Sequence, residues 1–191
     1  MASNPPIRIR GLVRVLPYLY LGNANAASNE EALQGQGITH IINLSSEDVD
    51  NFFEDEGDEG KGEFTYTNLH IKETHDGDAA QHFDELYDII LKIKDDKEKV
   101  LVHCTDGKSV SATVVYAYMM MASSKKNKHL PLVKAMDFVM GKEPGAQPRE
   151  NFMIQLIALE TKLYGEASMR VKPAKKQGRK GHKRGKGRRG H

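Results

Sequence analysis

The residues whose types and spacing best suit a chemical reaction lie in one short stretch around the single cysteine, Cys104. The aliphatic run at residues 100–102 predicts the end of a buried strand. A loop with one glycine follows, and the apolar residues 112–121 are compatible with a helix. A strand, a tight loop and a helix N-terminus direct backbone N–H groups and the helix dipole at one point, which suits an anion. A thiolate there would be stabilised, so the pattern indicates phosphoryl transfer through a phosphocysteine.

This stretch resembles the signature loop of the protein tyrosine phosphatases, and most closely that of the dual-specificity branch. The pattern of that family is His-Cys, five residues, Arg, and then Ser or Thr, and His103, Cys104, Gly107 and Ser111 match it. The resemblance implies that Cys104 is the nucleophile and that His103 orders the loop. It also implies that the Ser111 hydroxyl helps the thiolate to leave. The implied phosphate-binding residues are Thr105, Asp106, Gly107, Lys108, Ser109 and Val110.

The family arginine falls at position 110, where this chain has Val110. An arginine holds two phosphate oxygens through a bidentate fork, whereas valine has neither charge nor donor. An arginine that acts on a transferring phosphoryl group is worth about 10³ to 10⁵ in rate. Lys108 adds positive charge, but in related loops this position faces away from the phosphate, and Asp106 places negative charge beside the anion site. Position 110 therefore decides the functional question.

A second loop, residues 72–78, corresponds to the family loop whose aspartic acid protonates the leaving oxygen. Alignment from Phe83 places that role on Glu73, and a glutamic acid displaces the carboxyl by one methylene. Misplacement of about 1 Å can cost about a hundredfold in rate. Asp76 or Asp78 would serve instead if the loop folds inward, and all three are surface carboxylates in the simpler interpretation.

Near the C-terminal end of the resemblance, residues 144–156 match a "Pro…Pro-Asn…Phe…Gln-Leu" element of the family. The asparagine of that element braces the signature loop, and here the position is Arg149. Arg149 is a candidate to reach into the pocket and compensate in part for the missing arginine. The resemblance implies no cofactor and no metal.

The elements that must position these residues follow from periodicity. The hydrophobic pattern predicts strands over residues 7–12, 15–22, 38–44, 64–71 and 100–102. It predicts helices that begin at Ser28 and that span residues 81–94, 112–121, 130–140 and 151–163. Ser28 followed by Glu31 predicts a capping box. The methionines of residues 112–121 are expected to be core residues. The resemblance, which covers residues 7–164, implies a single α/β domain with a central mixed sheet and helices on both faces.

The net charge of +2 conceals a strong asymmetry. From Arg170 onward there are eleven Lys or Arg and no Asp or Glu, so the rest of the chain carries a net charge of −9. Residues 47–63 hold nine acidic residues and three glycines, which indicates a flexible acidic insertion. We therefore expect a flexible N-terminus at 1–6, a phosphatase-like domain at 7–165 and a disordered basic tail at 166–191.

One cysteine excludes an internal disulfide, which is typical of a reducing compartment. There is no signal-peptide pattern and no apolar run of membrane-spanning length. We expect a soluble intracellular protein of the cytoplasm, the nucleus or both, because the tail also resembles a nuclear or nucleolar address. The tail can bind RNA or another polyanion, the protein's own acidic insertion, or polyanions without specificity.

Two functional classes remain open at this stage. The first is a pseudophosphatase, or a very weak phosphatase, that binds phosphoproteins or signalling kinases. The second is an active protein tyrosine, serine and threonine phosphatase that works through a Cys104 phosphocysteine. Loss of the arginine favours the first, because lost transition-state charge stabilisation is seldom replaced.

Overall fold

The computed structural model describes residues 11–53 and 63–170. Its centre is a five-stranded sheet in the order β1-β2-β5-β3-β4. The strands are β1 (Leu12–Leu16), β2 (Leu19–Asn23), β3 (His40–Asn43), β4 (Thr65–Asn68) and β5 (Val100–Cys104). β1 pairs antiparallel with β2, whereas all other pairings are parallel, so the sheet is mixed as expected.

β5 lies in the middle of the sheet, between β2 and β3, and all five of its residues are buried. Strands that are covered on both faces have continuous apolar runs, and this explains why residues 100–102 show no alternation. The carboxyl end of β5 therefore delivers Cys104 from the most enclosed position in the sheet. The strand predicted from the sequence at this point is confirmed.

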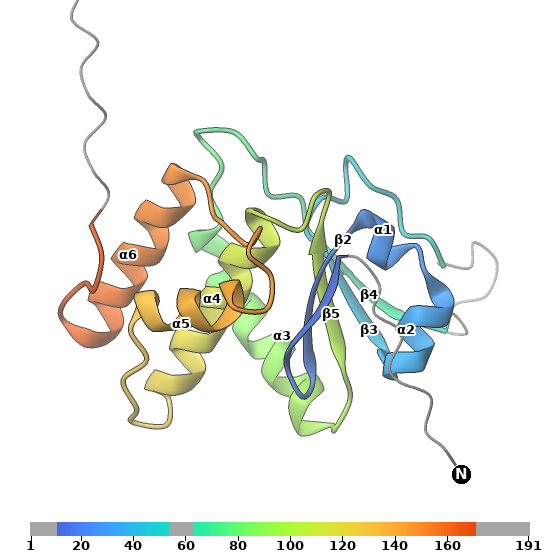
Figure 1. Ribbon diagram of the computed structural model, residues 1–191, viewed down its shortest axis with the longest axis horizontal. Helices are drawn as coiled ribbons and strands as arrows, with labels where there is room; N and C mark the ends of the chain where they lie inside the picture. The colour runs from blue at the N-terminus through green and yellow to red at the C-terminus, as the bar shows by residue number, and fades with distance from the viewer. Residues whose placement is uncertain (1–10, 54–62, 171–191) are drawn as a thin grey trace, which may run out of the picture.

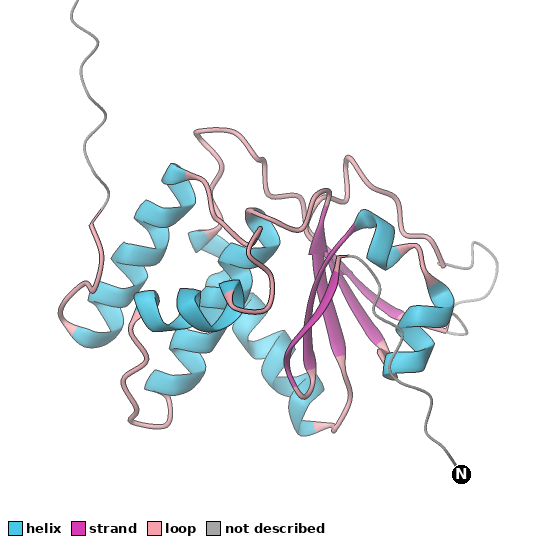
Figure 2. Cartoon of the chain, viewed as in Figure 1, coloured by secondary structure: helices cyan, strands magenta, loops and turns pink. Residues whose placement is uncertain are grey.

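Helices cover both faces of the sheet (Figure 1 and Figure 2). They are α1 (Ala24–Ala27), α2 (Glu30–Gln36), the 3₁₀ helix η1 (Ala80–His82), α3 (Phe83–Asp95), α4 (Val110–Ser124), α5 (Leu132–Met140) and α6 (Glu150–Tyr164). Figure 1 places α1 and α2 on one side, and the larger layer of α3 to α6 on the other. The single α/β domain with helices on both faces is confirmed.

α4 is the central helix of the larger layer. Every residue from Val110 to Met121 is buried, because β5 and β2 lie against one side and α3, α5 and α6 surround the rest. A helix that is buried all round carries no polar face. Met119, Met120 and Met121 are therefore core residues, as expected.

The start of α2 corrects one prediction. The N-cap is Asn29, whose side chain accepts the backbone N–H of Ala32, and not Ser28. The Ser28 hydroxyl instead donates to the carbonyl of Asn25, because the short helix α1, which the sequence did not predict, ends at this point. Both residue types cap well, so the pattern alone does not choose between neighbouring positions.

The C-terminal boundary also needs correction. Ser168 donates its backbone N–H to the buried carboxylate of Glu160, and its hydroxyl accepts the N–H of Val133. Met169 packs against the core. The folded domain therefore extends past residue 165, and residues 166–169 do not belong to a disordered tail.

Several sequence predictions lie outside the described residues. They concern the N-terminal residues 1–6, most of the strand expected at 7–12, the central part of the acidic insertion at 54–62, and the basic tail from residue 171 onward. Within the described ranges, no helix is both long enough and apolar enough to cross a bilayer.

Glu160 carries a testable consequence of this packing. It is 1% exposed, and its carboxylate accepts the N–H of Leu132, the first residue of α5, and the N–H of Ser168. Glu160→Ala leaves both amides without their acceptor, so we expect a loss of about 2 kcal/mol in unfolding free energy and a fall of about 4–8 °C in Tm. Thermal and urea unfolding followed by circular dichroism measure both quantities.

Lys162→Ala, on the same helix, is the control, and it should shift Tm by much less because Lys162 is exposed. An unchanged Tm in Glu160→Ala would show that solvent, and not Glu160, satisfies these amides.

Candidate active site

The candidate site is the loop that joins β5 to α4. Cys104 is the last residue of β5 and is 0% exposed, and α4 begins at Val110. The loop is fixed at its start because the carbonyl of Thr105 accepts the N–H of Ala24. Gly107 has φ of 74°, and a Cβ there would lie 2.8 Å from the carbonyl oxygen of Gly22. Only glycine therefore allows this close approach of loop and hairpin.

The sulfur of Cys104 has two side-chain neighbours from its own loop and helix. The Ser111 hydroxyl oxygen lies 3.2 Å from Sγ, in a fully buried position. The thiol donates to Oδ1 of Asp106 over 3.8 Å. Ser111 and Asp106, both singled out from the sequence, therefore lie next to the sulfur, and the contact of Asp106 with the thiol goes beyond its predicted place beside the anion site.

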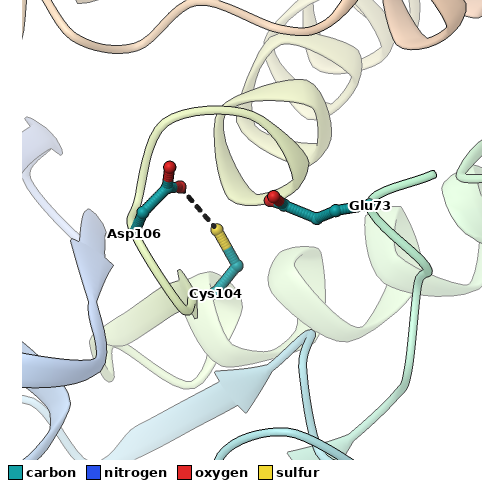
Figure 3. A group of neighbouring side chains, drawn as sticks. All are labelled: Glu73, Cys104 and Asp106. Atoms are coloured by element: carbon teal, nitrogen blue, oxygen red, sulfur yellow. Dashed lines mark hydrogen bonds between the residues drawn. The ribbon is translucent and has the colours of Figure 1, made fainter. Parts of the chain in front are cut away.

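Figure 3 shows that two carboxylates, Glu73 and Asp106, face the sulfur from different segments of the chain. One ligand atom from each of Glu73, Cys104 and Asp106 lies within 4.8 Å of the other two. Oε1 of Glu73 is buried and has no hydrogen-bond partner among the described residues. The immediate surroundings of the thiol are therefore acidic.

This environment keeps the thiol protonated. Burial is the largest effect and raises the pKa of Cys104, and the Glu73 carboxylate raises it further. The Ser111 hydroxyl and the backbone N–H groups of Ser111 and Gly107 act in the opposite direction but do not overcome burial. Nucleophilic cysteines have lowered pKa values in electropositive surroundings, and Cys104 has the reverse arrangement.

Val110 is a residue of the hydrophobic core. Its side chain is 0% exposed and belongs to the main hydrophobic core at the start of α4. The position that carries the arginine in the family pattern is therefore a packing position in this chain. It contributes apolar contacts to the fold and no charge to the loop.

The remaining loop residues have structural contacts. The backbone N–H of Lys108 donates to Oδ1 of Asp106 over 2.9 Å, and Asp106, Gly107 and Lys108 all line a cavity of about 220 Å³ between this loop and the β1–β2 hairpin. Ser109 is the N-cap of α4, and its Oγ accepts the backbone N–H of Arg149. Thr105 is exposed.

His103 is buried in β5, next to the nucleophile position. Burial lowers its pKa to about 4, so the imidazole is neutral at pH 7. Its Nδ1 is buried and has no hydrogen-bond partner among the described residues, and the neutral ring adds no positive charge to the loop.

The loop that carries Glu73 is held by α6. The amide of Asn151 donates to the carbonyls of Thr74 and Gly77. Gln155, one turn later, donates to Gly77 and accepts the N–H groups of Ala79 and Ala80. The sequence analysis did not assign this role to Asn151, although two polar residues at i and i+4 on one helix face were a signal for a shared partner.

Arg149 contacts the same loop through an ion pair with Glu73. Its guanidinium Nη2 lies 3.3 Å from Oε2 of Glu73, with the arginine 58% and the glutamate 27% exposed. It therefore pairs with the acid loop, and its compensation for the missing arginine stays a prediction. An ion pair this exposed contributes about 0.2–1 kcal/mol.

The two other candidate acids serve elsewhere. Oδ1 of Asp78 accepts the N–H groups of Ala80 and Gln81 and so caps η1. Asp76 is exposed, and a hydrogen bond from the Thr74 side chain lowers its pKa. Of the three carboxylates proposed from the sequence, Glu73 is the one that the structure brings to Cys104.

Glu73, Cys104 and Asp106 are also the described residues whose ligand atoms converge closely enough to hold a metal ion. A thiolate and carboxylates are ligand types that zinc accepts. Their arrangement matters here mainly for charge, because two carboxylates beside a loop that should receive an anion oppose a dianionic phosphate.

Comparison with known proteins agrees with the fold. The profile described as "Dual specificity phosphatase, catalytic domain" matches residues 19–162. Human dual specificity protein phosphatase 4 is 36% identical over 153 residues, which are 80% of this chain and 36% of that protein. Mouse protein phosphatase Slingshot homolog 1 is 38% identical over 146 residues, 76% of this chain and 13% of that protein. The chain spans about a third of the length of dual specificity protein phosphatase 4 and a smaller share of the Slingshot protein.

Two solved human structures share the fold. The tyrosine phosphatase-like serine/threonine/tyrosine-interacting protein superposes with a TM-score of 0.66 at 28% identity, over 78% of this chain and 95% of that one. Human DUSP28 superposes with a TM-score of 0.65 at 28% identity, over 84% of this chain and 97% of that one. The profile match, these structures and the position of Cys104 at the β5–α4 loop lead to one assignment: this chain belongs to the dual specificity phosphatase family of the cysteine-based protein tyrosine phosphatase superfamily.

Proposed function

We propose that this protein is a pseudophosphatase, or at most a very weak phosphatase, that acts by binding a protein partner. The observation that carries the proposal is Val110, whose side chain lies in the core where the family loop has its arginine. An arginine on a transferring phosphoryl group is worth about 10³ to 10⁵ in rate. The nearest arginine to the acid loop, Arg149, pairs with Glu73 instead.

The charge around the sulfur supports the same proposal. A phosphate that approaches Cys104 meets the carboxylates of Glu73 and Asp106. Two unit charges of the same sign at 4 Å repel by about 4 kcal/mol at an effective dielectric constant of 20. In addition, burial raises the pKa of Cys104, so less of the reactive thiolate is present at pH 7 than for an exposed cysteine.

The alternative is an active tyrosine, serine and threonine phosphatase with a Cys104 phosphocysteine. One observation favours it: the Ser111 hydroxyl lies 3.2 Å from Sγ, where it can stabilise a leaving thiolate. Glu73 would then be the acid that protonates the leaving oxygen. This alternative retains the nucleophile, the hydroxyl and an acid, but position 110 supplies no arginine for the transition state.

For the partner, we propose a signalling kinase or a phosphoprotein, which is the class that a phosphatase scaffold without turnover can bind. The basic residues from Arg170 onward suit RNA or another polyanion, with eleven Lys or Arg and no acidic residue. Because the chain spans only part of its curated relatives, these partners are proposed for this chain and not taken from them.

Hydrolysis of para-nitrophenyl phosphate tests the proposal. We expect the unmodified protein and Cys104→Ser to give equal rates, because transition-state charge is not stabilised. Val110→Arg should gain turnover of at least about tenfold over the unmodified protein, since an arginine is worth more than that when well placed. This gain should disappear in Val110→Arg/Cys104→Ser.

Val110→Ala is the matched control, because it alters the same buried position without adding a donor and should remain inactive. Circular dichroism of each variant shows whether the fold is retained. Turnover by the unmodified protein that Cys104→Ser abolishes would contradict the proposal and support the phosphocysteine alternative. In that case, loss of turnover in Arg149→Asn would show that Arg149 replaces the missing arginine.

The protonation state of the thiol gives a second test. The pKa of Cys104 is raised, so the thiolate should form only above the ordinary thiol range of about 8.5. The rate of alkylation by iodoacetamide, measured against pH, should therefore have its midpoint above that value. The chain has one cysteine, so the label reports Cys104 alone.

Glu73→Gln should move this midpoint to lower pH, because it removes a carboxylate that disfavours the thiolate. Glu85→Gln, an exposed glutamate on α3, should leave it in place. A midpoint at or below pH 7 in the unmodified protein would show an activated thiolate. It would contradict surroundings that raise the pKa of Cys104.

A further inference from the structure

We propose that Asp106 is a built-in occupant of the anion cradle: its carboxylate takes the place of a phosphate oxygen in the β5–α4 loop and excludes oxyanions, independently of Val110. This inference deepens the proposed function and rests on it for its meaning in partner recognition. Control of oxyanion binding by this one carboxylate can be measured separately from turnover.

The contacts of Asp106 are those that a bound anion would make. Its Oδ1 receives the backbone N–H of Lys108 at 2.9 Å and the thiol of Cys104 at 3.8 Å. Loops that lead into a helix N-terminus bind phosphate through backbone N–H groups of this kind. One such N–H is therefore already satisfied by a negatively charged group of the loop itself.

The direction of the side chain matters more than its charge. Asp106 is exposed, but the hydrogen bond from the N–H of Lys108, two residues later, holds its Oδ1 on the side of the loop that faces the sulfur. Figure 3 shows it above the Cys104 sulfur, with Glu73 facing the sulfur from the other side. The backbone geometry of the loop thus holds the carboxylate in the cradle.

No cation among the described residues forms an ion pair with Asp106. Among the residues that the structure describes, the ion pair at this site joins Arg149 to Glu73 and leaves Asp106 without one. A dianionic phosphate would have to displace the carboxylate from its N–H donor and also overcome its repulsion. Loss of the arginine removes an attraction for phosphate, whereas Asp106 adds a repulsion that keeps phosphate out. The two changes therefore act separately.

The consequence concerns how a partner is recognised. A loop whose anion cradle already holds a carboxylate does not bind a phosphate group of its partner. Of the two partner classes proposed above, this favours the unphosphorylated surface of a kinase, bound outside the loop, over a phosphorylated side chain inserted into it.

Tungstate, a phosphate-like oxyanion, provides the test on the full chain. Protection of Cys104 from iodoacetamide by increasing tungstate reports binding at this loop alone, because the basic tail contains no cysteine. We expect no protection of the unmodified protein at 1 mM tungstate, on the order of the weakest affinities that such assays resolve. Asp106→Ala should gain protection at concentrations at least about tenfold lower, since the charge is removed and the Lys108 N–H is freed.

Asp106→Asn separates charge from occupancy. Its side-chain oxygen can still accept the Lys108 N–H but carries no charge, so its protection should fall between those of the unmodified protein and Asp106→Ala. Asp137→Ala, which removes an exposed carboxylate on α5, is the matched control and should behave as the unmodified protein. Each variant is compared with its own alkylation rate without tungstate, so a change in thiol reactivity alone does not count as binding.

Equal protection of Asp106→Ala and the unmodified protein would overturn the inference, whether both bind tungstate or neither does. That outcome differs from failure of the proposed function, which would appear as Cys104-dependent hydrolysis by the unmodified protein. If Asp106→Ala alone did not fold, Asp106→Asn, which keeps the turn, would still decide by gaining protection or failing to gain it.

Discussion

The burial of β5 against α4 is the constraint on which the rest of the structure depends. All residues of β5 and the first twelve of α4 are buried, so strand, loop and helix form one apolar unit at the centre of the domain. Apolar burial is worth roughly 25 cal/mol per Å², and a unit enclosed on every side has no alternative position of similar energy. The sulfur of Cys104 is fixed by this packing, and the hairpin, the acid loop and α6 are arranged around it.

The same constraint explains how chemistry and fold can be separated in one loop. The cradle shape comes from the backbone, whereas attraction for phosphate comes from side-chain charge. A valine at position 110 satisfies the core better than a charged residue would, because burying an unpaired charge is costly. The loop can therefore retain its shape while its electrostatic character changes from cationic to anionic.

Much of this was predictable from sequence, and the exceptions have physical reasons. The β5 run, the amphipathic α3 and the buried α4 follow from local hydrophobic patterns, and the residues around Cys104 follow from their spacing. The N-cap of α2 was misplaced by one residue because Ser28 and Asn29 are both good caps. The pairing of Arg149 with Glu73 and the bracing by Asn151 join residues more than 70 positions apart, which no local pattern reports.

The matched residues of the loop are not in themselves evidence for activity, because packing accounts for them. Gly107 is required by its contact with Gly22, and any side chain there would collide with the hairpin. Ser111 is fully buried, and its hydroxyl needs the sulfur as a partner whether or not phosphate ever binds. By contrast, the hydrogen bond from the Lys108 N–H to residue 106 needs an acceptor but not a charged one, and Val110 contributes packing but no charge. Under the proposed function, the loss of phosphate chemistry in this loop therefore rests on Asp106 and Val110, which supply a negative charge and no charge where the family has its anion site.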